Sequence, residues 1–273
     1  MRLRLLPVLL LFGYAFIYAP IAYLMLFSFN DSRLVTAWSG FSFRWYAALW
    51  NDRPLIDAAL LSLRIAAASA SAALILGTLA GFAMARFGPF RGRALFAACL
   101  AAPLVLPDVI AGLALLLLFV ALEQAFGWPA GRGALTIGIA HASISVSYVA
   151  VVVQARLADA GRTLEDAAAD LYAPPWKVFA AITLPLMAPA LVSGWLLAFT
   201  LSLDDVVVAS FTSGPGASTL PMVVFSSLRL GPTPEINALA GVVVGLVGIG
   251  LAAAWLVQRR RAQRMIAPDR TLL

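Results

Sequence analysis

Residues 165–194, which read EDAAADLYAPPWKVFAAITLPLMAPALVSG, contain the only long polar and helix-favouring passage in a chain that is otherwise a succession of apolar runs. Acids and alanines fill its first part, and Pro174 and Pro175 interrupt the helical pattern there. An apolar helix started by Pro185 follows directly. We expect the polar passage to be a docking surface, mechanically coupled to the helix that follows it.

The composition is that of a membrane protein. Hydrophobic residues make up 62% of the 273 positions and charged residues only 12%, which lies outside the range of soluble globular domains. A helix needs about 20 predominantly apolar residues to cross a bilayer. Six runs meet this requirement: 7–29, 62–85, 94–122, 134–154, 186–211 and 237–258. The sequence therefore predicts an all-α, polytopic protein with six transmembrane helices in a single transmembrane domain, residues 1–273.

The distribution of arginine and lysine predicts the orientation. Most of the 19 basic residues lie in the two terminal segments, between the second and third runs, and in the loop 155–185. By the positive-inside rule, both termini and this loop are expected on the cytoplasmic side. The net charge of +6 then reflects topology and not nucleic-acid binding. The first run is longer than the core of a signal peptide, so we expect a retained signal anchor.

Several kinds of chemistry lack the residues they need. Lys177 is the only lysine and is not part of a Gly-Lys-Ser/Thr phosphate loop, so the chain holds neither ATP nor Mg²⁺ by that route. His141 and Cys99 are the only residues of their types, which excludes a structural zinc site of several His and Cys ligands. A Ser/His/Asp triad with His141 stays open as an alternative, although a hydrogen-bonded packing role for this histidine is favoured.

Three acids lie in apolar sequence, namely Asp108, Asp204 and Asp205. A carboxylate at membrane depth costs about 3 kcal/mol by insertion scales, so such residues usually face protein or water and mark a pathway. Neighbours on a helix point about 100° apart, hence one acid of the pair 204–205 is expected to line a path while the other caps or pairs. The alternative is that both acids bond to helix ends or to arginines near the outer interface.

The outer segments and the small residues permit two interpretations each. The aromatic stretch 38–50 is typical of an interfacial belt, but it could also contact an external partner. In segment 212–235 a short apolar piece predicts a re-entrant or interfacial helix. Small residues form packing faces, within the subunit or against a partner, in the second and sixth runs: Gly77, Gly81, Gly241, Gly245, Gly248 and Gly250.

The loop 155–185 is expected to form two short helices. Thr163 would cap the first helix, whose first turn holds Glu165 and Asp166 where the helix dipole favours acids. Pro174 would stop it, and a second helix over 176–182 would follow. Three residues give this second helix an apolar face for a partner's groove: Trp176, Phe179 and Ala180.

At these residues the chain resembles the permease subunits of bacterial ABC importers. Their cytoplasmic loop reads Glu-Ala-Ala, three residues, Gly, nine residues and Ile-x-Leu-Pro. Here Asp166-Ala167-Ala168, Tyr172 and Ile182-Thr183-Leu184-Pro185 keep both spacings, with Asp at the Glu position and Tyr at the Gly position. Tyr172 in a left-handed turn would cost about 1–2 kcal/mol. The resemblance implies that this loop couples the permease to an ATPase through nine residues: Glu165, Asp166, Ala167, Ala168, Tyr172, Trp176, Ile182, Leu184 and Pro185.

The similarity is greatest to polyamine permeases of the putrescine type, in stretches such as APLVLPDVIAGLALLLLFVAL and SGWLLAFTLSLDDVVVASFTSGPGASTLPMVVFSSLRLG. It implies the type I importer permease fold, location in the bacterial inner membrane and no enzymatic activity of the chain itself. The implied partners are two ATPase subunits that carry ATP and Mg²⁺, a second permease and a periplasmic polyamine-binding protein. An ion-coupled carrier of an organic cation remains the alternative, because such carriers also keep acids in their helices.

Overall fold

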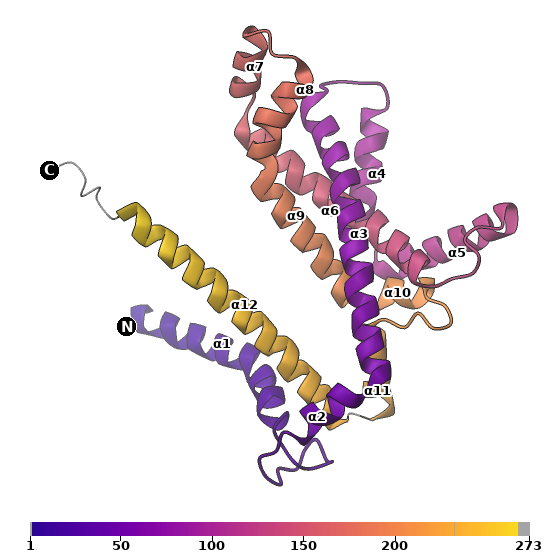
Figure 1. Ribbon diagram of the computed structural model, residues 1–273, viewed down its shortest axis with the longest axis vertical. Helices are drawn as coiled ribbons and strands as arrows, with labels where there is room; N and C mark the ends of the chain where they lie inside the picture. The colour runs from indigo at the N-terminus through magenta and orange to yellow at the C-terminus, as the bar shows by residue number, and fades with distance from the viewer. Residues whose placement is uncertain (1, 232, 267–273) are drawn as a thin grey trace. The chain divides into compact units, whose positions relative to one another are not determined.

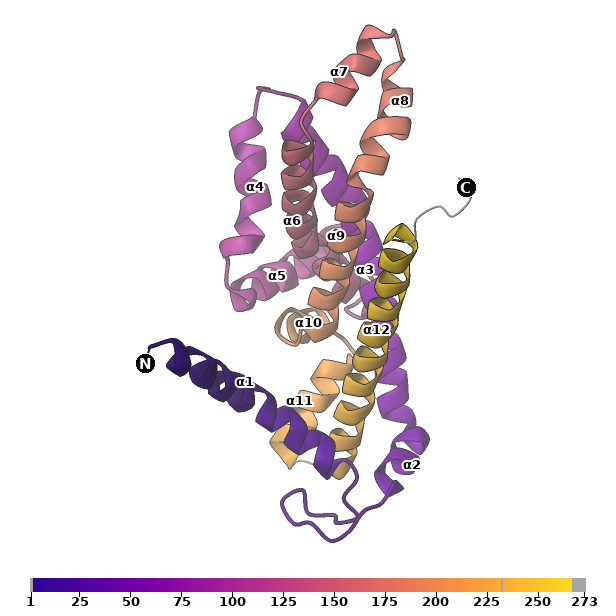
Figure 2. The same ribbon diagram turned by 90° about the vertical axis from the view of Figure 1, so that its left-hand side faces the viewer.

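The computed structural model describes residues 2–231 and 233–266 (Figure 1 and Figure 2). Its regular elements within these residues are all helices, and one isolated β-bridge joins Asn30 and Phe41. The residues form two compact units, Met1–Ile56 with Ser226–Leu273, and Asp57–Phe225. The predicted all-α architecture is confirmed, whereas a single transmembrane domain stays a prediction.

The first unit contains α1 (Arg2–Phe27), α2 (Arg44–Asn51) and α12 (Pro234–Ile266). The second unit contains most of α3 (Arg53–Arg86) and the start of α11 (Leu220–Leu230). Between these two helices come α4 (Arg93–Val105), α5 (Asp108–Phe126), α6 (Ala134–Ala160), α7 (Thr163–Asp170), α8 (Pro175–Val178), the π-helix η1 (Phe179–Thr183), α9 (Leu184–Asp204) and α10 (Val207–Thr212).

Five described segments are long and apolar enough to cross a bilayer: Pro7–Phe27, Arg53–Arg86, Asp108–Phe126, Ala134–Ala160 and Pro175–Asp204. Three shorter apolar helices accompany them: Arg93–Val105, Leu220–Leu230 and Pro234–Gly250. The helix expected within 212–235 is thus present as α11. The predicted number of six transmembrane helices is therefore approximate: the described residues contain five long apolar segments and three shorter apolar helices.

The third predicted span, 94–122, is wrong as a single helix, because the chain breaks between α4 and α5. Leu106 has an extended backbone with ψ 134°, and Pro107 follows it. Proline disfavours helical backbone at the preceding residue and has no N–H to continue the helix. Asp108 therefore lies in the first turn of α5 and not inside a longer helix. Sequence hydropathy is continuous across this break and could not reveal it.

The core of the second unit lies between α3, α6 and α9. Seven buried side chains form it: Ala70, Ala73, Val149, Val153, Leu157, Met187 and Ala198. Gly81 lets α3 approach α6, since a Cβ there would lie 2.6 Å from the Ala150 carbonyl oxygen. Gly77 faces Val149 in the same way, at 2.6 Å from its Cβ. In lipid, such close approach replaces the hydrophobic drive, so these two glycines serve packing within the subunit.

In the first unit, α12 packs against α1 and α2. The Ser28 hydroxyl lies 2.7 Å from the Tyr46 hydroxyl, and Gly241 of α12 leaves room for this pair. The buried Trp45 donates its indole N–H to the Asn30 carbonyl at 2.8 Å. Trp50 in the same aromatic stretch is 82% exposed. Both interpretations of the stretch, lipid belt and partner surface, stay predictions.

Candidate functional site

A break in the fifth predicted span forms the first part of the site. Helix α9 ends at Asp204, and Asp205 adopts extended backbone with φ −70° and ψ 128°. Its carboxylate accepts the amides of Val208 and Ala209 at 3.3 and 2.7 Å, so it caps α10. Aspartate competes in this way with the helical backbone, and the β-branched residues that follow favour the interruption. The expectation that Asp204 and Asp205 share one continuous helix is wrong.

His141 on α6 joins this break to the neighbouring helices. Its Nδ1 atom lies 2.7 Å from the Ser202 hydroxyl of α9, and its Nε2 atom lies 3.1 Å from the Asp205 carboxylate. Ser69 of α3 donates to the Ser202 oxygen at 3.2 Å. Ser69, Ser202 and His141 are all buried. The predicted hydrogen bonding of His141 is confirmed, and it links α3, α6, α9 and α10.

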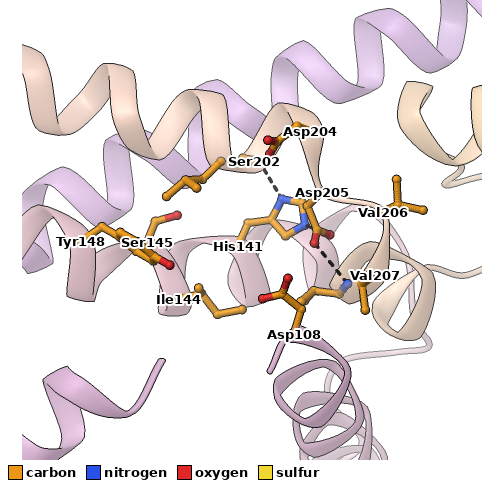
Figure 3. A pocket seen from close by; sticks show the side chains of 12 residues that line it. Asp108, His141, Ile144, Ser145, Tyr148, Ser202, Asp204, Asp205, Val206 and Val207 are labelled. Carbon is orange, nitrogen blue, oxygen red and sulfur yellow. Dashed lines mark hydrogen bonds and ion pairs between the residues drawn. The ribbon is translucent and has the colours of Figure 1, made fainter. Parts of the chain in front are cut away.

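His141, Ser202 and Asp205 line a pocket of about 400 Å³ within the second unit (Figure 3). Its walls come from the start of α5, the middle of α6, the end of α9 and the start of α10. Three carboxylates line it: Asp108, Asp204 and Asp205. Figure 3 shows Asp108 and Asp204 on either side of the His141 ring. The structure thus brings together all three acids that the sequence singled out.

The three acids differ in what they contact. Asp205 is occupied by His141 and by the start of α10. Within the described residues, Asp108 and Asp204 form no ion pair with a basic side chain, and both are exposed to the pocket. Carboxylates without a cationic partner in an apolar protein can stabilise a cationic ligand electrostatically. The described residues contain no cluster of three or more His, Cys, Asp or Glu side chains suited to a metal ion.

The residues Ser202, His141 and Asp205 have the composition of a hydrolase triad. However, the Ser202 oxygen is already bonded to both Ser69 and His141, and its residue is only 6% exposed. The Asp205 carboxylate caps α10 at the same time. The arrangement therefore serves to fix helices relative to one another.

The second predicted site is the loop 155–185. Its first residues belong to α6, which ends at Ala160, and α7 follows. Glu165 and Asp166 lie in its first turn as expected, but the predicted cap at Thr163 is wrong. Arg162 holds the N-cap position, where it makes no side-chain cap, and Thr163 is already helical. The Arg162 guanidinium instead donates to the carbonyls of Ala85 and Arg86 at the end of α3, at 3.3 and 2.7 Å.

Tyr172 ends this helix with a left-handed backbone. Its φ is +57°, the one positive φ of a non-glycine residue in the described chain. Its amide donates to the Ala169 carbonyl at 2.9 Å and the Ala173 amide to the Ala168 carbonyl at 3.1 Å, which is the Schellman pattern of helix ends. Glycine is favoured at this position. The side chain of Tyr172 is 97% exposed.

The prediction of a separate second helix over 176–182 is wrong. Helical conformation continues without a break from Pro175 to Asp204, through α8, η1 and α9. The widened turn η1 ends at Thr183, two residues before Pro185, whose ring would clash with the preceding turn of a regular α-helix. Phe179 also departs from the expected partner face, since its ring packs edge-on against Phe82 at 5.5 Å. Trp176 is 67% exposed and lies under the Lys177 ammonium, 5.6 Å from its ring.

The other predicted coupling residues have different surroundings. Glu165 is half-buried and contacts Arg86 and Thr183, whereas Asp166 next to it is exposed. The remaining residues lie along the same loop and helix: Ala167, Leu184 and Pro185 exposed, Ala168 and Ile182 half-buried. Sequence reasoning missed Arg86, Ser69 and Ser202. In the sequence, Arg86 is one of the basic residues between the second and third apolar runs, which indicate orientation only. The serines lie among small residues that indicate packing, so no local pattern identifies any of the three.

Comparison with known proteins places this geometry in context. Over residues 73–265 the chain matches the family described as "Binding-protein-dependent transport system inner membrane component". It is 58% identical over 259 residues to the "Putrescine transport system permease protein PotI" of Escherichia coli (strain K12), covering 94% of this chain and 92% of that protein. It is 39% identical over 248 residues to the "Spermidine/putrescine transport system permease protein PotC" of Haemophilus influenzae, covering 90% and 93% of the two chains.

Among solved structures, a chain of a bacterial ABC transporter involved in the import of the acidic polysaccharide alginate superposes with a TM-score of 0.68. The match covers 93% of this chain and 94% of that chain at 16% identity. This likeness concerns the fold alone, and it agrees with the fold expected from the sequence.

Proposed function

This chain belongs to the family of inner membrane components of binding-protein-dependent transport systems, and from that premise we propose that it is the permease subunit of an ATP-driven polyamine importer. It is a multi-pass inner membrane protein. The proposed substrate is putrescine, with spermidine second, because the relatives at 58% and 39% identity are named for these amines. Transport would proceed by alternating access, without covalent chemistry in this chain.

The observation that carries the proposal is the pair of carboxylates without basic partners, Asp108 and Asp204, in a pocket of about 400 Å³. Putrescine is a dication at neutral pH, since its two amines have pKa values near that of lysine. Two carboxylates from different helices, α5 and α9, could each receive one ammonium group. Movement of α5 relative to α9 would then change the affinity of the pocket for the amine.

The proposed ATPase contact is the exposed surface of α7 and α8. Leu171, Tyr172 and Trp176 are 82%, 97% and 67% exposed there, which is a large amount of apolar surface next to the acids of α7. Aromatic anchors of this kind dominate the energy of many protein interfaces. Since the chain lacks a phosphate loop, ATP and Mg²⁺ would be held by two partner ATPase subunits.

The remaining partners follow from the same proposal. A second permease would complete the translocation path, and a periplasmic binding protein would deliver the amine. The positive-inside distribution supports cytoplasmic termini and a cytoplasmic α7–α8 loop.

Reconstitution tests the function. The permease is purified together with candidate ATPase, second permease and binding-protein subunits from the same organism, and uptake of radiolabelled putrescine and spermidine into proteoliposomes is measured. Uptake that requires both ATP and binding protein is expected. An ion-coupled carrier would instead transport the amine with the permease alone under a proton or sodium gradient, and this result would replace the proposal.

A further inference from the structure

We infer that Arg86 and Glu165 form an intramolecular joint that fixes α7 to α3, α6 and η1, which leads into α9, so that Glu165 acts inside this subunit and not on the ATPase surface. The inference deepens the proposed function, because α7 is the helix on which the ATPase is proposed to act. It concerns positioning residues, which transmit movement without touching the substrate.

The joint lies where α3 and α6 end, and α7 extends beyond it at this end of the second unit (Figure 2). Arg86 is the last residue of α3, and its Nε atom lies 2.8 Å from the Glu165 Oε2 atom of α7. A second guanidinium nitrogen of Arg86 donates to Glu165 Oε1 at 3.3 Å. The side chains of this ion pair are 10% and 15% exposed, so solvent screens it less than a surface pair.

The same two side chains also bind α6 and η1. Arg86 donates to the carbonyls of Leu157 and Gly161, at 3.1 and 2.8 Å. These carbonyls belong to the end of α6, where helical acceptors lack partners and a positive charge is favourable. Thr183 in η1 donates its hydroxyl to Glu165 at 2.7 Å. Two side chains thus connect four helical segments.

The connected helices continue to the acidic pocket. From Leu157 back to His141 the distance along α6 is about 24 Å, and from Thr183 to Asp204 along α9 it is about 31 Å, at 1.5 Å per residue. His141 and Asp204 line the pocket. A displacement of α7 would therefore move both helices that carry these pocket residues.

Glu165 is consequently a poor candidate for an ATPase contact, although the sequence resemblance placed it in the coupling set. Its carboxylate is already occupied by Arg86 and Thr183. Asp166 is exposed, so of the two acids in the first turn of α7 it is the one available to a partner.

The chain offers a direct probe of the joint, because Lys177 is its only lysine and follows α7 closely. The full chain is solubilised in detergent and carries a purification tag that contains no lysine. The rate at which a protease specific for lysine cleaves it then reports how often the α7–α8 segment opens. We expect Arg86→Gln and Glu165→Gln each to raise the cleavage rate at Lys177 about tenfold, and the double variant to raise it by less than the product of the two factors, because the single variants break one shared pair. Asp159→Asn removes an exposed acid of α6 and should leave the rate unchanged.

In the reconstituted complex, the same three variants should bind the ATPase with affinity close to that of the parent. Uptake per ATP hydrolysed should fall about tenfold, within the range of typical coupling factors. Asp166→Asn should instead weaken ATPase binding.

Two results would overturn the joint. One is an unchanged cleavage rate in all three variants. The other is loss of ATPase binding in Glu165→Gln with normal binding in Arg86→Gln, which would return Glu165 to the interface. If the parent chain itself recruits no ATPase, the proposed function fails, and the proteolysis still decides on the joint.

Discussion

The Nε2 atom of His141 lies 3.1 Å from the carboxylate of Asp205, and this contact separates the roles of two adjacent acids. The Asp205 carboxylate also accepts the Ala209 amide at 2.7 Å, which commits it to contacts within the protein. Asp204 immediately before it is exposed in the pocket and has no basic partner among the described residues. Adjacent positions in the sequence therefore provide one carboxylate that is bonded within the protein and one that faces the pocket.

Neutralising each acid separately tests this division. Asp204→Asn should raise the amine concentration that gives half-maximal uptake by about ten- to a hundredfold, since a charge-assisted hydrogen bond contributes about 1.5–3 kcal/mol. Asp205→Asn should lower the stability of the purified permease by about 1–3 kcal/mol, because it weakens the α10 cap and leaves His141 with a poorer partner. Uptake kinetics and thermal unfolding in detergent measure the two effects.

Asp57→Asn, an exposed acid of α3 outside the pocket, is the matched control and should change neither quantity. If the Asp204→Asn variant has the same half-saturating amine concentration as the parent, the charge of the substrate is bound by other residues.

His141 is expected to act on stability through Asp205. His141→Ala should destabilise the permease by about 1–3 kcal/mol, because it leaves two polar groups, Ser202 and Asp205, without their shared partner. In the His141→Ala background, Asp205→Asn should add less destabilisation than it causes alone, as expected for residues of one network. Thermal unfolding of the parent, the two single variants and the double variant measures this coupling as a double-mutant cycle. Fully additive losses would contradict the network.

Residue patterns predict the helical architecture and single out the three acids that line the pocket, because apolar run length and charge in apolar sequence are both local signals. They did not predict the breaks at Pro107 and Asp205. Hydropathy stays high across both positions, and Asp205 interrupts its helix through bonds to amides that come after it. The apolar run 94–122 therefore predicts a single helix, whereas the structure has two, α4 and α5.

The sequence also does not predict which side chains contact each other across helices. Glu165 lies in a recognisable loop pattern, but its contact with Arg86 joins positions 79 residues apart in the chain. The same holds for Ser69 and Ser202, which are 133 residues apart. Such pairs depend on how α3 packs against α6 and α9. Short-range spacing contains no information about that packing.

Gly81 of α3 and Gly245 of α12 should tolerate substitution by alanine differently. Gly81→Ala would place a Cβ 2.6 Å from the Ala150 carbonyl oxygen, so it should force α3 away from α6 and reduce stability by about 1–3 kcal/mol. Gly245 in α12 has nothing within 4 Å of an added Cβ in the described residues. Gly245→Ala should therefore leave the solubilised permease as stable as the parent.

Thermal unfolding of the two variants side by side provides the comparison. A loss of uptake in Gly245→Ala with unchanged stability would indicate that this face of α12 meets another subunit. Equal stability of Gly81→Ala and the parent would contradict the close α3–α6 packing.

Tyr172 permits a test that separates backbone strain from partner contact. Its ring is 97% exposed, so neither Tyr172→Gly nor Tyr172→Ala removes a packed side chain from the permease. Because φ is +57°, glycine should relieve strain, and Tyr172→Gly should be about 1 kcal/mol more stable than Tyr172→Ala in the isolated chain. If the ring is an anchor for the ATPase, both variants should lose affinity for it by about tenfold or more, since aromatic anchors contribute about 2 kcal/mol or more. Titration of the ATPase against each variant measures this affinity. Undiminished binding in both variants would limit Tyr172 to ending α7, and the exposed Trp176 would then be the next anchor to substitute.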